Sequence, residues 1–100
     1  FGGEIPETYG VPVSEIQEGI RHGVRKVNID TDLRLASTGS IRQFLHTHPD
    51  EFDPRKYLNE SMKAMKEIVI NRYEAFGTVG NASKIKPVGL EAMAEFYLSA

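Results

Sequence analysis

The sequence contains no cysteine, and its formal net charge is only −2. Without cysteine the chain forms no disulfide, thiolate-ligated zinc site, iron–sulfur cluster or thiol nucleophile. Its charge balance is a poor match to nucleic acid, which proteins bind through an excess of lysine and arginine. No apolar run reaches the ~18–20 residues of a membrane span, and no signal-peptide pattern opens the chain. We therefore expect neither nucleic acid nor membrane as a partner, and a cytoplasmic location.

The chain is also short, with 100 residues of which 40% are hydrophobic and 26% charged. This is an ordinary composition for one small globular domain or for part of a larger one. The sequence begins Phe1-Gly2-Gly3 without an initiator methionine. We therefore expect a fragment of a longer polypeptide.

Apolar residues recur with helical spacing over four segments, which predicts helices at residues 14–22, 32–47, 54–76 and 90–98. For the first helix, Ser14 is the predicted N-cap, with Gln17 at the capping-box position. Thr31 or Asp32 is predicted to cap the second helix, and Asp53, followed by Pro54, the third. Glycines at positions 23 and 77 predict helix stops, and residues 77–87 a polar loop.

Residues 24–29 (VRKVNI) are too few for a helix and predict the one strand of the chain. Val24, Lys26 and Asn28 share one face of that strand, and Arg25, Val27 and Ile29 share the other. A polar face of this kind is typical of a strand that faces a binding site or a barrel interior. A lone strand leaves its backbone groups unpaired, so its partners are expected in sequence outside this chain.

Polar residues are densest at the end of that strand, in Asn28-Ile29-Asp30-Thr31-Asp32. Ligands of α/β proteins bind at this edge of the sheet, and a helix N-terminus there favours a phosphate. Asn28 and Thr31 supply groups that bind substrate oxygens, and Asp30 can accept from a hydroxyl. Asp30, Thr31 and Asp32 are equally the residue types that cap a helix, so spacing alone leaves both interpretations open.

Arg55 and the three histidines are two further groups of candidate site residues. Arg55 follows Asp53-Pro54 at a helix start, where a cation is mildly unfavourable for the helix dipole, which indicates an outside partner such as a phosphate or a carboxylate. A solvated arginine is the simpler interpretation. His22, His46 and His48 do not have metal-ligand spacing, since residues two apart point to different sides of a helix.

Three segments together resemble the class II, zinc-dependent fructose-1,6-bisphosphate aldolases, over essentially all 100 residues. They are GGEIPETYGVPVSEIQEGIRHGVRKVNIDTDLRLA, FDPRKYL and RYEAFGTVGNASKIKP, and NIDTD is the most specific part. The resemblance is greatest to the bacterial branch that includes Calvin-cycle aldolases. It implies an α/β fold, the C-terminal part of a (β/α)8 TIM barrel, which is mostly helical as an isolated chain. Residues 1–49 are then the last part of the barrel, including strand 8 and helix 8, and residues 50–100 a C-terminal helical extension.

The resemblance implies a lyase of glycolysis, gluconeogenesis or the Calvin cycle. The reaction is reversible cleavage of fructose 1,6-bisphosphate to dihydroxyacetone phosphate and glyceraldehyde 3-phosphate. Zinc polarises the ketone in this family, but the family's zinc ligands and acid/base carboxylate match nothing in this chain. The resemblance therefore implies that the 100 residues alone are inactive. The implied partners are the rest of the aldolase chain, a second subunit in a homo-dimer or larger homo-oligomer, and sugar phosphates.

Site residues follow from the same resemblance. Asn28 matches the catalytic asparagine beside the reacting carbons of dihydroxyacetone phosphate. Ile29, Asp30 and Thr31 match residues at its phosphate end, and Arg55 matches an arginine that holds the far phosphate in the neighbouring subunit. Two alternatives stay open, an independent helical dimerisation module and an aldolase for another ketose bisphosphate such as tagatose bisphosphate.

Overall fold

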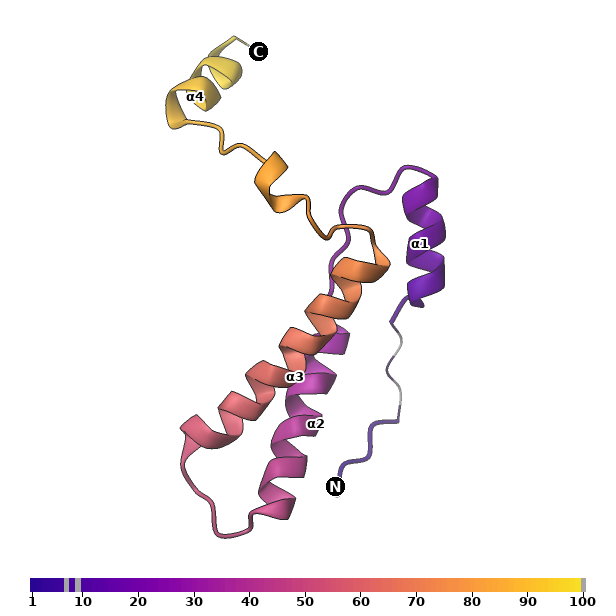
Figure 1. Ribbon diagram of the computed structural model, residues 1–100, viewed down its shortest axis with the longest axis vertical. Helices are drawn as coiled ribbons and strands as arrows, with labels where there is room; N and C mark the ends of the chain where they lie inside the picture. The colour runs from indigo at the N-terminus through magenta and orange to yellow at the C-terminus, as the bar shows by residue number, and fades with distance from the viewer. Residues whose placement is uncertain (7, 9, 100) are drawn as a thin grey trace.

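A computed structural model describes residues 1–6, 8 and 10–99 of the chain. Within these residues the structure is helical and contains no strand (Figure 1). The helices are α1 (Val13–Arg21), α2 (Thr31–Thr47), α3 (Pro54–Ala75), the short 3-10 helix η1 (Ala82–Lys84) and α4 (Leu90–Leu98). The four predicted α-helices are confirmed to within one residue at each end. None of the described helices is both long and apolar enough to cross a membrane.

Helices α2 and α3 form an antiparallel hairpin, joined by the loop of residues 48–53 (Figure 1). At their contact the Ser37 and Ser61 hydroxyls are hydrogen-bonded, with 2.7 Å between the two Oγ atoms. Ser61 is 3% exposed, and two short side chains at this point let the helices approach closely. The loop ends at Asp53, whose carboxylate accepts from the Arg55 N–H at 3.0 Å, so the predicted cap of α3 is confirmed.

Helical spacing in α3 predicts an apolar stripe of Leu58, Met62, Met65, Val69, Tyr73 and Phe76, and the described chain covers only part of it. The α2-facing side includes Ser61 and Arg72, both of which bond to α2 residues. On the neighbouring side, Leu58, Met62 and Tyr73 are about half to two-thirds exposed. Met65, Val69 and Phe76 are half-buried, so about half of the predicted stripe is covered within the described chain.

Helix α1 lies against the C-terminal end of α3. The Gln17 side chain donates from Nε2 to the carbonyl oxygen of Ala75 at 2.9 Å. The predicted capping box at Ser14 is wrong, because the Pro12 carbonyl accepts the first helical bonds and α1 begins at Val13 without a side-chain cap. Gln17 is consequently used between helices instead of within its own.

Both predicted glycine stops are confirmed, by the same geometry. Gly23 has a φ of +108° and Gly77 a φ of +69°, the left-handed region that glycine enters without a Cβ penalty. After Gly23, the Val24 N–H donates to the carbonyl oxygen of Gly19 at 3.0 Å, and after Gly77, the Thr78 N–H donates to that of Tyr73 at 2.9 Å. These are Schellman motifs, which reverse the chain and satisfy the last carbonyls of α1 and α3.

Residues 24–29 join α1 to α2 and are not a strand in this structure. A strand requires a hydrogen-bonded neighbour, and none lies beside this segment in the described residues. The predicted alternation is partly confirmed, since Val27 and Ile29 are half-buried while Lys26 and Asn28 are exposed. Val24 does not share the outward face with Lys26 and Asn28. The Schellman bond turns it toward the same hollow as Val27.

No apolar side chain among the described residues is fully buried. The radius of gyration is 19.1 Å and the molecule extends over 60 × 32 × 26 Å, with α4 packed on no other described helix (Figure 1). The prediction of a mostly helical isolated chain is thus confirmed. The (β/α)8 barrel and the division into residues 1–49 and 50–100 stay predictions, and the α2–α3 contact crosses that division.

Candidate functional site

The polar cluster predicted at residues 28–32 lies at the start of α2. Asp30 is the N-cap residue through its backbone, and its carbonyl oxygen accepts from the Arg34 N–H at 3.0 Å. Thr31 opens the helix, and no side chain caps it, so the prediction of a Thr31 or Asp32 cap is wrong. The first N–H groups of α2 therefore form an uncapped, partly positive helix end.

The two carboxylates of this cluster are each paired with an arginine. Asp30 contacts the Arg34 guanidinium at 2.8 Å on the exposed surface of α2. Asp32 accepts from Nη2 of Arg72, on α3, at 2.7 Å. Since both carboxylates face guanidinium groups, the helix end carries little net negative charge that would repel an anion.

Asn28 and Thr31 are the polar residues of the cluster whose side chains have no hydrogen-bond or ion-pair partner among the described residues. Asn28 is exposed and Thr31 is half-buried. In the part of the chain that the structure describes, neither side chain has a hydrogen bond to another residue. Together with the free N–H groups of α2, the amide and the hydroxyl provide donors at one place, which suits a phosphate or a sugar oxygen.

Arg55 lies at the start of α3, where its guanidinium pairs with Asp53. Nη2 is 2.6 Å from Oδ2 of Asp53, and Nε is 3.0 Å from Oδ1. Hydrogen bonds from Arg55 lower the pKa of Asp53, and the same bond raises the pKa of Arg55. The side chain of Arg55 is nevertheless 89% exposed, so it can reach a ligand on another molecule. The carboxylate that pairs with Arg55 here is the local one of Asp53, and the predicted outside partner stays a prediction.

A second ion pair borders this one in the same loop. The Lys56 ammonium donates to the Glu51 carboxylate, which lowers the pKa of Glu51 and raises that of Lys56. Glu51 also accepts from the Asp53 N–H at 3.2 Å. The turn before α3 is thus fixed by local charge pairs that hold Arg55 at the tip of the hairpin.

The structure does not bring the Asn28–Thr31 cluster and Arg55 together. Thr31 begins α2, whereas Arg55 follows the loop after the end of α2, at the opposite end of the hairpin (Figure 1). The 17 residues of α2 correspond to a length of about 25 Å at 1.5 Å per residue. One small ligand cannot bridge both groups of the same chain.

The histidines also stay apart. Nε2 of His22 is 2.9 Å from Glu18, and the ring of His48 stacks on Phe44 with 4.5 Å between centroids. The ring of His46 lies 5.4 Å from that of Phe1. Within the described residues no group of three or more histidine, aspartate or glutamate side chains is placed to hold a metal ion. The residues present do not fit a zinc site.

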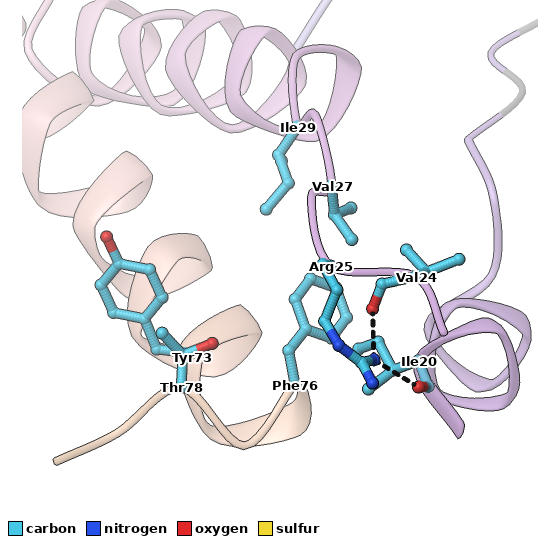
Figure 2. A pocket seen from close by; sticks show the side chains of 8 residues that line it. All are labelled: Ile20, Val24, Arg25, Val27, Ile29, Tyr73, Phe76 and Thr78. Atoms are coloured by element: carbon cyan, nitrogen blue, oxygen red, sulfur yellow. Dashed lines mark hydrogen bonds between the residues drawn. The ribbon is translucent and has the colours of Figure 1, made fainter. Parts of the chain in front are cut away.

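An apolar hollow of about 270 Å³ lies behind residues 24–29. Figure 2 shows Val27 and Ile29 on one side of it and Tyr73 and Phe76 on the other. The Arg25 guanidinium crosses its edge and donates to the carbonyl oxygens of Ile20 and Val24, each at 3.1 Å. Because exposed Asn28 is not part of its lining, this hollow supports the segment from behind and is separate from the polar cluster.

The chain was compared with known protein families and curated proteins. Residues 7–81 match the family model "Fructose-bisphosphate aldolase class-II". The chain is 70% identical over 97 residues to a fructose-bisphosphate aldolase of Pseudomonas aeruginosa, and 70% identical over 99 residues to one of Stutzerimonas stutzeri. It is 60% identical over 97 residues to the corresponding protein of a Nostoc species. These matches cover 97–99% of this chain but only 27–28% of each relative, so the chain spans about a quarter of their length.

Proposed function

Because the chain belongs to the class II fructose-bisphosphate aldolase family, we propose that it is the C-terminal, substrate-holding part of such an enzyme. The intact protein would act in the cytoplasm and cleave fructose 1,6-bisphosphate reversibly to dihydroxyacetone phosphate and glyceraldehyde 3-phosphate. Within it, residues 24–29 would be the last strand of a (β/α)8 barrel and α2 the helix that follows. The strands that hydrogen-bond to residues 24–29 would then be the neighbouring strands of that barrel.

The start of α2 is the proposed site for dihydroxyacetone phosphate. Thr31 and the free N–H groups of α2 would bind its phosphate, with the Ile29 backbone alongside. Asn28 would donate to the oxygen beside the reacting carbons, where charge develops in the transition state. Asp30 would act by holding Arg34, not by touching the phosphate, since two anions in contact repel. The observation that carries this assignment is that the Asn28 and Thr31 side chains have no hydrogen-bond partner among residues 1–6, 8 and 10–99.

Arg55 is proposed to bind the second phosphate, in the active site of a neighbouring subunit. The hairpin length of about 25 Å supports action in trans, because a six-carbon bisphosphate is far shorter than that. The bond to Asp53 pre-orients the guanidinium while leaving it exposed, which favours a charge-assisted contact with phosphate. The proposed functional unit is accordingly a homo-dimer or a larger homo-oligomer.

Zinc, the metal of this family, would be held by residues outside these 100, because the histidines here do not converge on one point. This chain's contribution is therefore binding and orientation of the substrate. By the same reasoning the 100 residues alone would not cleave the bisphosphate.

The two phosphate assignments are separated by variants of the intact enzyme. Arg55→Ala should lower kcat/KM for the bisphosphate about 10–100-fold, as expected for loss of one charge-assisted contact. It should leave proton exchange on dihydroxyacetone phosphate nearly unchanged, since that ketose has one phosphate. Thr31→Ala should impair both reactions. Arg42→Ala, which removes an exposed arginine of α2, is the matched control and should alter neither.

Action in trans is tested with mixed dimers of Arg55→Ala and Asn28→Ala subunits. In such a dimer, one site combines the intact Asn28 of one subunit with the intact Arg55 of the other. Cleavage should therefore recover in the mixture relative to either parent variant. If the mixture stays as inactive as both parents, Arg55 acts within its own subunit or only supports the turn.

The alternative of a different ketose bisphosphate is tested by competition. The intact enzyme should prefer fructose 1,6-bisphosphate over tagatose 1,6-bisphosphate when both are present, and the reverse preference would reassign the substrate. The alternative of an independent helical module is weakened by the lack of any fully buried apolar side chain in the described chain. A domain that folds alone has such a core.

A further inference from the structure

Arg72 and Asp32 form the one ion pair of the described residues that joins two helices. The other six ion pairs join residues no more than five apart in sequence, whereas this pair spans 40 positions, from α2 to α3. Its side chains are also sheltered, at 15% exposed for Arg72 and 36% for Asp32. Shelter from water makes a pair of this kind stronger than the exposed local pairs.

The pair meets the polar cluster at its C-terminal residue, Asp32. Asp32 is the second residue of α2 and directly follows Thr31, so the two share the first helical turn. The Nη2 atom of Arg72 lies 2.7 Å from Oδ2 of Asp32, and Nη1 of Arg72 donates to Oδ1 of Asn71 at 2.7 Å. The guanidinium is thereby held on α3 and fixes the first turn of α2 against it.

The N-terminal segment passes near the other oxygen of the Asp32 carboxylate. A Cβ atom built on Gly10 would lie 3.5 Å from Oδ1 of Asp32, so the N-terminal segment passes close to this carboxylate. The first turn of α2 therefore lies between the N-terminal segment and α3, and its hydrogen bond is to Arg72 of α3. Rotation of this turn would move the Thr31 hydroxyl and the free N–H groups together.

From this geometry we infer that Arg72 is a positioning residue for the dihydroxyacetone phosphate site and acts through Asp32. The inference rests on the proposed function. Arg72 does not touch substrate. By fixing the first turn of α2, Arg72 sets the orientation of the Thr31 hydroxyl and of the first N–H groups of α2 toward the phosphate. Small displacements of such donors weaken binding strongly, because hydrogen bonds to a charged oxygen depend on distance and angle.

The experiment uses the intact enzyme and four variants: Arg72→Met, Arg72→Lys, Asp32→Asn and the double variant Arg72→Met/Asp32→Asn. We expect Arg72→Met to raise KM for the bisphosphate, and the dissociation constant of dihydroxyacetone phosphate, roughly 10-fold. Its kcat should stay within about threefold, because phosphate is held equally in the ground and transition states. Arg72→Lys should recover most of the loss, since a lysine can still contact one carboxylate oxygen.

Two further comparisons separate positioning from general stability. If Arg72 acts through Asp32, the double variant is no worse than the worse single variant, within about twofold. Ser37→Ala removes a hydrogen bond between the same two helices, away from the polar cluster, and serves as the control. It should lower the melting temperature and leave KM unchanged.

The inference is overturned if Arg72→Met shifts KM no more than Ser37→Ala, or if the losses from Arg72→Met and Asp32→Asn multiply. If Arg72→Met does not fold, an unchanged KM in both Arg72→Lys and Asp32→Asn overturns it. Thr31→Ala distinguishes failure of this inference about Arg72 from failure of the proposed phosphate site at the start of α2. If Thr31→Ala weakens dihydroxyacetone phosphate binding and the Arg72 variants do not, only this inference fails; if Thr31→Ala has no effect, the proposed site itself fails.

Discussion

The described surface of the chain is too large for a domain that folds alone, which predicts how residues 1–100 behave when expressed without the rest of the protein. The accessible area is 8510 Å². A compact monomer of 11.2 kDa exposes roughly 5,700 Å², so about 2,800 Å² of extra surface is open. Likewise the radius of gyration is 19.1 Å, against about 13 Å for a compact domain of 100 residues.

The consequence for the isolated polypeptide is loss of cooperative structure. Short helices are marginal in water without tertiary packing, and here only α2 and α3 pack extensively on each other. We expect partial helicity by far-ultraviolet circular dichroism, no near-ultraviolet signal and a broad, non-cooperative thermal transition. Small-angle scattering should give a radius of gyration well above 13 Å, and the polypeptide should show no cleavage of fructose 1,6-bisphosphate.

The intact protein, in which we expect this surface to be covered, is the control and should melt cooperatively. The reasoning is refuted if residues 1–100 alone are monomeric, have a radius of gyration near 13 Å and unfold in one sharp transition. Such a result would mean that the chain closes on itself and has its own core.

Three shorter predictions concern single residues, each in the intact enzyme. Ser61→Leu should lower the free energy of unfolding by about 1–3 kcal/mol in denaturant titration, because Ser61 is 3% exposed between α2 and α3, whereas Ser61→Ala should cost less than about 1 kcal/mol. Asn28→Ala should lower kcat on the order of 10²-fold with the zinc content by atomic absorption unchanged; a kcat within threefold of the parent would remove Asn28 from the reacting carbons. Asp53→Asn should reduce stability most above pH 4. Hydrogen bonds from Arg55 lower the pKa of Asp53 below its usual 3.8, so the carboxylate's stabilisation is present above that value and is lost as the pH falls through the depressed pKa. The measurement is the melting temperature of the parent minus that of Asp53→Asn at several pH values. An increase in this difference as the pH is lowered would contradict the prediction.

The sequence by itself determined the local structure of this protein. Apolar spacing predicted all four α-helices, Asp53-Pro54 predicted the start of α3, and the glycines at 23 and 77 predicted two helix ends. These features depend on contacts within a few residues, so their signal is local. The sequence also indicated the family, through the resemblance of NIDTD and FDPRKYL to the class II aldolases, and the family match over residues 7–81 confirmed the family.

The tertiary structure decided everything that depends on residues distant in sequence. It placed Arg72 on Asp32 and Gln17 on the Ala75 carbonyl, contacts 40 and 58 positions apart that no spacing rule predicts. It placed Thr31 and Arg55 at opposite ends of the hairpin, because α2, about 25 Å long, lies between them. It also showed residues 24–29 unpaired, since a strand exists only through hydrogen bonds to a neighbour, and the described chain contains none.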